Sequence, residues 1–218
     1  IEAKLRARRT LLDTPGLVGL ALAGLNMAAG EALARARGVA VVTLLGGTVK
    51  AVPAYNSTGL WIQPVDKLAD EAEALLAEGF AAVKLRLGRD DFSHDLAAVR
   101  AVKKRIGDQV LMGDFNITPE DRDVYDPVAW AGQIHCTPEE REHFKQLCAL
   151  GLVDAFRLFE QPPKSWSWWD YRNLAFRKNQ GLRIDIILVS EALKAAVREC
   201  AIDKLPRKNE RPSDHAPV

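Results

Sequence analysis

Two polar side chains close an apolar stretch at residues 109–116, QVLMGDFN. Asp114 and Asn116 are two residues apart, so on an extended strand their side chains lie on the same face. Carboxylate and amide oxygens are hard ligands that suit Mg²⁺, which proteins usually hold with one or two carboxylates and a substrate phosphate. The pair predicts either a metal-handling strand end or a simple turn, because Asp and Asn also favour turns.

A single carboxylate, Asp185, stands in the run LRIDIILVS at 182–190, which is otherwise nearly all apolar apart from Arg183. Burying a charge without a partner is costly, so the sequence predicts a partner for it. His215 in the closing PSDH is the natural choice, since a carboxylate holds a histidine in one tautomer. The alternative is an ion pair between Arg183 and Asp185.

The segment SWSWWDYR at 165–172 combines four aromatic residues with one cation. Trp168, Trp169 and Tyr171 offer flat apolar walls beside the cation Arg172, which suits a flipped-out sugar or an unstacked base. Packing in the core is the alternative. The alternation of a strand predicts that one of the two tryptophans packs inward.

Alternating strand and helix patterns must position these groups. Strands separated by single helices imply parallel pairing through right-handed crossovers. The expected strands are 49–57, 81–88, 109–116 and 182–190, with a turn entering a further strand at 211–218. The expected helices are 16–29, 64–80, 90–107, 136–152 and 191–200. Thr137 can cap the helix 136–152, with Pro138 in its first turn.

Four segments resemble the exonuclease III family of Mg²⁺-dependent DNA-repair nucleases in their order and spacing. They are MGDFNITPED, SWWDYR, GLRIDIILVS and RPSDHAPV, between about Val110 and the last residue. Members of this family cleave at abasic sites and trim 3′ ends. The resemblance implies half of an α/β sandwich, Mg²⁺ as cofactor and DNA as partner.

The resemblance also implies a role for each matching position of the site. Asp114 activates or positions the attacking water and helps to hold the metal with Asp214. Asn116 orients the water and the phosphate. Asp185 orients His215, which contacts the phosphoryl oxygen. Such chemistry is mostly positioning and neutralisation of charge.

Substrate contacts follow from the same resemblance. Trp168, Leu182 and Ile184 would form the wall of an abasic pocket, with Arg172 as the phosphate-binding cation beside it. The family's first half supplies an Asn, a metal-binding Glu and an active-site Tyr that have no counterpart in this sequence. A principal metal ligand is therefore missing, and we expect weak activity or none.

Residues 1 to about 109 resemble a different family, the mandelate racemase group of the enolase superfamily. The resemblance rests on GLALAGLNMAAGEALARARG, LLGG, VPAYNS and GFAAVKLRLG. It implies that Lys84 and Arg86 match a cation pair that faces an enolate, and that Asp114 falls on the first metal ligand. The later barrel strands are absent, so we interpret Lys84 and Arg86 as relics or surface charges.

The expected architecture is an α/β chimera. A βαβαβ partial (β/α)-barrel segment at 1–109 would join half of an exonuclease III-type sandwich at 110–218, giving one compact unit with a mixed sheet that shares strand 109–116. The leading function is Mg²⁺-dependent phosphodiester hydrolysis on DNA, as an abasic-site endonuclease or 3′–5′ exonuclease. An engineered or recombined scaffold without activity, and enolate chemistry of the racemase or cycloisomerase type, are the alternatives. Homodimerisation stays open.

Composition limits the remaining classes. The chain has 218 residues, of which 48% are apolar, and a net charge of +1, so the overall charge makes no case for nucleic acid or membrane. Three cysteines without a Cys-x-x-Cys suggest neither a disulfide framework nor a zinc ribbon. No signal-peptide layout and no apolar run near the roughly 18 residues of a membrane span appear. We therefore expect a cytoplasmic protein, and the abrupt ends suggest a fragment or fusion.

Overall fold

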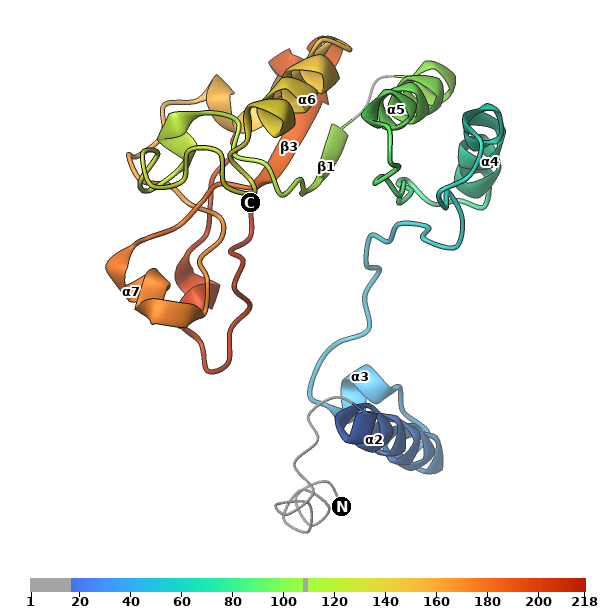
Figure 1. Ribbon diagram of the computed structural model, residues 1–218. Helices are drawn as coiled ribbons and strands as arrows, with labels where there is room; N and C mark the ends of the chain where they lie inside the picture. The colour runs from blue at the N-terminus through green and yellow to red at the C-terminus, as the bar shows by residue number, and fades with distance from the viewer. Residues whose placement is uncertain (1–16, 108–109) are drawn as a thin grey trace. The chain divides into compact units, whose positions relative to one another are not determined.

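The computed structural model describes residues 17–107 and 110–218 of the chain. The chain divides into two units, Ile1–Pro53 and Ala54–Val218, rather than the single unit expected (Figure 1). Strand 110–114 belongs to the same unit as the two helices before it. The boundary proposed near residue 109 stays a prediction.

Helices α2 (Leu17–Ala36) and α3 (Val41–Leu44) are the described elements of the first unit. The helix expected over residues 16–29 forms as part of α2, although Gly16 lies outside the described residues. The expectation that it is packed is wrong for its large side chains, because Leu20 is 70% exposed and Met27 is 74% exposed. The four-residue α3 is too short to cover a helix of 20 residues.

Helices α4 (Val65–Ala77) and α5 (Phe92–Ile106) open the second unit and pack against each other, as their apolar spacing predicts. Their shared core consists of Leu60, Leu68, Ala72, Leu75, Ala98 and Val102. The Asp91 side chain accepts a hydrogen bond from the Ser93 amide at 2.8 Å and caps α5. Gly107 ends the helix at a φ of 81° that favours glycine.

The strands expected at 49–57 and 81–88 do not form. A single parallel bridge, between Asn56 and Val83, represents them in the described part of the chain. A strand needs a neighbour to pair with and a layer to bury its apolar face, and Val49 and Val52 remain 75% and 71% exposed. The expected βαβαβ barrel segment therefore lacks its sheet in these described residues.

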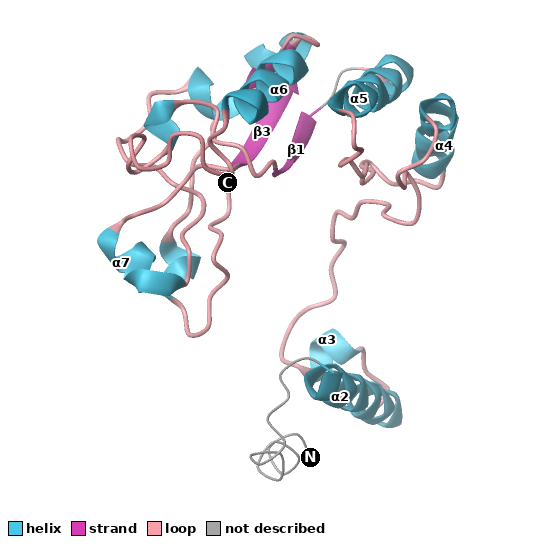
Figure 2. Cartoon of the chain, viewed as in Figure 1, coloured by secondary structure: helices cyan, strands magenta, loops and turns pink. Residues whose placement is uncertain are grey.

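The sheet of the second unit has the order β1-β3-β2, with β1 (Val110–Asp114), β2 (Leu152–Asp154) and β3 (Asp185–Ser190). Both pairings are antiparallel, so the expected parallel and mixed sheet is wrong, while the α/β class is confirmed (Figure 2). Periodicity identified the strands 109–116 and 182–190 but carried no information about which strands pair.

Helix α6 (Pro138–Cys148) covers one face of this sheet. Thr137 accepts a hydrogen bond from the Glu140 amide at 3.2 Å, and the Glu140 carboxylate accepts one from the Thr137 amide, so the predicted cap is confirmed as a capping box. Phe144 and Leu147 of α6 pack in one cluster with Ile186 and Leu188 of β3. The neighbouring Val189 belongs to a second cluster with Ala155 and Phe156, as the alternation of a strand requires.

Short helices fill the remaining connections. They are η1 (Asp121–Asp123), η2 (Ala155–Leu158), η3 (Arg172–Leu174), α7 (Ala175–Lys178), η4 (Glu191–Ala196) and η5 (Leu205–Lys208). The helix expected at 191–200 is the 3₁₀ turn η4, and the strand expected at the end of the chain is reduced to a bridge between Trp168 and His215. No helix among residues 17–107 and 110–218 has the length and apolar character needed to cross a membrane.

A buried ion network ties the approach to β3 to two other segments. Arg183 is 1% exposed, and its Nε lies 2.6 Å from Asp123 Oδ1 while its Nη2 lies 2.7 Å from Asp154 Oδ2. Arg157 also binds Asp123. The alternative pairing of Arg183 with Asp185 is therefore wrong, because Asp123 and Asp154 take up the guanidinium.

We expect Asp123→Ala to lower the free energy of unfolding by about 3–5 kcal/mol, because it leaves the buried Arg183 without one of its two carboxylate partners. Chemical denaturation followed by circular dichroism measures the change. Asp121→Ala is the matched control, since Asp121 is exposed in its pair with Arg141 and its loss should cost less than about 1 kcal/mol. Equal stability of the two variants would contradict a role for the network.

Candidate active site

The register of β1 and β3 brings the two predicted carboxylates together. Asp114 stands directly opposite Asp185 in the antiparallel ladder. His215 lies between them, with Nδ1 at 2.8 Å from Asp185 Oδ2 and Nε2 at 3.9 Å from Asp114 Oδ2. An ionised carboxylate only accepts hydrogen bonds, so the His215 Nδ1–H donates to Asp185. The other ring nitrogen, Nε2, then faces Asp114.

The turn after β1 fixes the position of Asp114. Asn116 adopts a left-handed φ of 53°, which asparagine tolerates better than most residues. Its amide donates to Asp114 Oδ1 at 2.9 Å, and its side-chain Nδ2 donates to Asp114 Oδ2 at 3.1 Å. Asp114 and Asn116 therefore form the turn after β1 and also belong to the candidate site.

The segment that carries Asp214 and His215 is held by the tryptophan segment. Trp168 Nε1 donates to Asp214 Oδ2 at 3.0 Å, and the Trp169 amide donates to the Asp214 carbonyl at 3.0 Å. The Ala216 amide donates to the Ser167 carbonyl at 2.7 Å. Residues from the end of the chain thus reach the end of β1, about a hundred residues earlier in the sequence.

Asp114 and Asp214 are the two carboxylates that the resemblance predicts as Mg²⁺ ligands. Among residues 17–107 and 110–218, no group of three His, Cys, Asp or Glu side chains is placed to hold a metal ion. One oxygen of Asp214 also accepts the indole N–H of Trp168. The donors suit a cation that needs one or two carboxylates and completes its shell with water and substrate phosphate, and they do not suit an all-protein cage.

The predicted substrate-contacting residues differ in accessibility. Leu182 and Ile184 are 0% and 2% exposed and belong to a core cluster, against which the half-buried Trp168 packs. A sugar would reach them only if the covering side chains moved. Trp169 is fully buried, which confirms that one of the two tryptophans packs inward.

Arg172 is exposed but already engaged with a carboxylate. Its Nε lies 3.0 Å from both oxygens of Asp170, and its Nη2 lies 2.6 Å from Asp170 Oδ2. The hydrogen bonds from Arg172 lower the pKa of Asp170 below its usual value. An incoming phosphate would have to compete with this carboxylate for the guanidinium.

Two contributors to the site were missed in the sequence. His135 has a φ of 75°, its Nδ1 lies 2.7 Å from the Asn116 carbonyl oxygen, and its ring centroid lies 6.2 Å from that of Trp168. Ser167 Oγ accepts hydrogen bonds from the amides of Ile184 and Asp185, both at 3.0 Å. No local sequence pattern identifies either residue, because each one contacts segments that are distant in the sequence.

Of the two cations matched to the enolase superfamily, Arg86 makes contacts within the local fold. Lys84 is exposed. Arg86 donates to the carbonyls of Gly59 at 2.8 Å and Ser57 at 3.1 Å, and its guanidinium stacks 3.7 Å from the Trp61 ring centroid. Within the described part of the chain, no hydrogen bond or ion pair joins either cation to Asp114.

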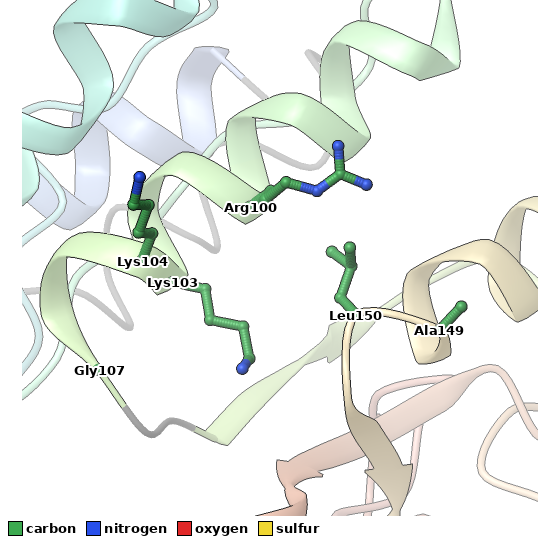
Figure 3. A pocket seen from close by; sticks show the side chains of 6 residues that line it. All are labelled: Arg100, Lys103, Lys104, Gly107, Ala149 and Leu150. Carbon is green, nitrogen blue, oxygen red and sulfur yellow. The ribbon is translucent and has the colours of Figure 1, made fainter.

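The second unit carries a larger hollow and a smaller one. The larger, of about 490 Å³, lies between α5 and the turn after α6, as Figure 3 shows. Of its three cations, Lys103 and Lys104 lie in the last turn of α5, where the helix dipole favours positive charge, and Arg100 lies one turn earlier. The smaller, of about 210 Å³, is lined by Asp114 and Asp185 together with apolar side chains. The smaller hollow is therefore the one lined by predicted site residues.

Burial shapes the protonation of the site. The pKa of Asp185 is raised above its usual 3.8, first by burial and also by the charge of Asp114, while hydrogen bonds from His215 and Ser167 oppose the rise. A carboxyl group with a raised pKa in the folded state contributes stability that is complete below about pH 3.8. This contribution is lost as the pH rises through the folded-state pKa.

We expect His215→Leu to raise the pKa of Asp185 further, because the variant removes a hydrogen bond that favours the ionised form. The pH range over which the Asp185 carboxyl stops stabilising the folded state then moves upward. Carbon-13 NMR titration of the aspartate carboxyls measures the pKa, and urea unfolding at several pH values measures the stability. His94→Leu, at an exposed position of α5, should leave Asp185 unchanged. A lowered Asp185 pKa in His215→Leu would contradict the assignment.

Comparison with known proteins identifies the family of the chain. Residues 31–215 match the Endonuclease/Exonuclease/phosphatase family. Exodeoxyribonuclease III of Haemophilus influenzae is 40% identical over 116 residues, which are 50% of this chain and 43% of that protein. The chain spans less than half the length of the curated relatives it matches.

Solved structures agree with this result. The 3′ phosphatase NExo from Neisseria, bound to a product DNA hairpin, is 45% identical, with a TM-score of 0.55, and the match covers 57% of this chain and 49% of that one. An AP endonuclease from Archaeoglobus fulgidus is 26% identical, with a TM-score of 0.50 over 59% of this chain and 53% of that one. The chain therefore belongs to the Endonuclease/Exonuclease/phosphatase family, and its resemblance to the exonuclease III and AP endonuclease nucleases is confirmed.

Proposed function

We propose that the chain hydrolyses phosphate esters at DNA 3′ ends with Mg²⁺, and that cleavage at abasic sites is the second candidate. The observation that carries the proposal is the position of His215 between two carboxylates, 2.8 Å from Asp185 and 3.9 Å from Asp114. A histidine held in this way presents one fixed nitrogen to a substrate.

In the proposed reaction, each side chain has a separate task. Asp114 takes a proton from the attacking water as the water oxygen bonds to phosphorus, and the ester oxygen leaves and takes a proton from solvent water. Asn116 keeps Asp114 in place through its two hydrogen bonds. His215 contacts a phosphoryl oxygen through Nε2, while Asp185 holds its Nδ1. Mg²⁺, held by Asp114 and Asp214 when bound, would supply positive charge against the phosphate.

The choice of 3′ ends over abasic sites is supported by burial. An abasic sugar needs an open apolar wall, and Leu182 and Ile184 are buried in the core. A terminal phosphate or nucleotide needs only the accessible carboxylates and the hollow beside them. The more similar structure is described as a 3′ phosphatase, at 45% identity, while the AP endonuclease is 26% identical.

We also propose that activity is weak and that the chain is a chimera. Weak activity is supported by the described residues, among which no group of three His, Cys, Asp or Glu side chains is placed to hold a metal ion. A separate origin of residues 1–109 is supported by the α4–α5 pair having its own core cluster. The family match beginning at residue 31 weighs against such an origin. Enolate chemistry finds no support, because Arg86 is occupied by backbone carbonyls.

We expect the chain to release phosphate from a DNA hairpin with a 3′-phosphate when Mg²⁺ is present. Asp114→Asn and His215→Gln should each lower the rate by roughly 10²–10⁴-fold, because each removes a group that acts in proton transfer or charge stabilisation. Phosphate release measured by a colorimetric assay gives the rate, and a duplex with an abasic site tests the second candidate.

Exposed residues of the same types on the helical pair provide controls. Asp66→Asn on α4 and His94→Gln on α5 should keep the wild-type rate. Chelation of divalent cations should abolish release. Equal rates in Asp114→Asn, His215→Gln and the wild type would sink the assignment, and no release by the wild-type chain would favour the scaffold alternative.

A further inference from the structure

Arg207 is a buried cation without a carboxylate partner among the described residues. Its side chain belongs to η5, and the residue is 6% exposed. No salt bridge within residues 17–107 and 110–218 reaches it, and its Nε has no hydrogen-bond partner there. A buried guanidinium usually pairs with an acid, so another feature must stabilise this one.

Three aromatic rings take the place of the acid. The guanidinium carbon lies 4.9 Å from the ring centroid of Phe176, 5.5 Å from that of Tyr171 and 5.8 Å from that of Trp169. Ring faces attract cations, and a desolvated site strengthens the attraction. We call Trp169, Tyr171 and Phe176 the aromatic cage.

The caged guanidinium donates a hydrogen bond to the carbonyl of Ser213. Ser213 directly precedes the site residues Asp214 and His215. Its side-chain Oγ accepts a hydrogen bond from the His215 amide at 3.1 Å. Arg207 thus holds the residue next to the segment that carries the site.

Two members of the cage hold the neighbouring carbonyls. The Tyr171 hydroxyl donates to the Pro212 carbonyl at 2.7 Å, and the Trp169 amide donates to the Asp214 carbonyl at 3.0 Å. Three consecutive carbonyls, 212–214, are therefore held by Arg207 or by residues whose rings it contacts. A guanidinium is the group that suits this place, because it can stack on rings and donate in its own plane.

We propose that Arg207 is a positioning residue, whose caged guanidinium fixes the turn 212–214 and so sets the distance of His215 from Asp185 and Asp114. Arg207 acts through the backbone and does not touch the substrate. Its kinetic effect rests on the proposed function, whereas its geometric effect does not. Loss of the cage contact frees the turn while the β1–β3 ladder remains paired.

The chain offers a matched control on the same ring. Lys204 Nζ lies 5.7 Å from the Trp169 ring centroid but donates to the carbonyl of Lys164 at 3.0 Å. Lys204→Met therefore removes a cation from the cage region without removing a hydrogen bond to the turn. Arg207→Met removes both.

The experiment compares Arg207→Met, Arg207→Lys and Lys204→Met with the wild type by NMR, without DNA or metal. In Arg207→Met we expect the amides of Trp169 and Ala216 to exchange with solvent at least about tenfold faster, with less than about twofold change in β3. The hydrogen-bonded His215 Nδ1 proton signal should broaden or disappear. Lys204→Met should match the wild type.

Arg207→Lys keeps the charge, loses the planar group and keeps the proposal testable if Arg207→Met does not fold. It should speed exchange at the same two amides. Wild-type exchange and an unchanged His215 signal in either Arg207 variant would overturn the proposal. Equal acceleration throughout β3 would do so too, because it would indicate a role in overall stability. Failure of the wild-type chain to release phosphate would refute the proposed function and leave this test intact.

Discussion

The site depends on the register of one antiparallel strand pair. β1 and β3 place Asp114 directly opposite Asp185, an arrangement of like charges that by itself destabilises a sheet. His215 between the two carboxylates offsets this repulsion. A slip of one residue would turn Asp185 to the other face and break the contact with His215. Apolar packing on the β3 face of Ile186 and Leu188 fixes the register, so the packing that forms the core also places Asp185 opposite Asp114.

Arg183, just before β3, and Asp185, its first residue, have different partners. Arg183 turns into the interior, where Asp123 and Asp154 neutralise it, whereas Asp185 is held by His215. A regular strand would send residues two apart to the same side. The amides of Ile184 and Asp185 both donate to Ser167 Oγ, although successive amides of a regular strand point in opposite directions. The backbone is therefore irregular at this point, and the two charges are served by different partners.

The features that could be predicted from the sequence are those whose physical cause lies in neighbouring residues. Thr137 followed by Pro138 identified the start of α6, and the isolated charge of Asp185 in an apolar run identified its histidine partner. The partners of Arg183, Asp123 and Asp154, lie 60 and 29 residues away, and nothing local distinguishes them from other acids. The antiparallel pairing of β1 with β3 could not be predicted for the same reason. Periodicity shows that 109–116 is a strand, but it does not show which strand lies beside it.

The distance in sequence between Asp114 and His215 has a consequence for how the site comes into being. Contacts between residues so far apart close a long loop, and they are made only when the sheet and the final segment are both in place. The contact between Asp114 and His215 therefore reports on completion of folding rather than on any local element. Conversely, any ligand that binds there only in the folded state stabilises the folded chain by mass action.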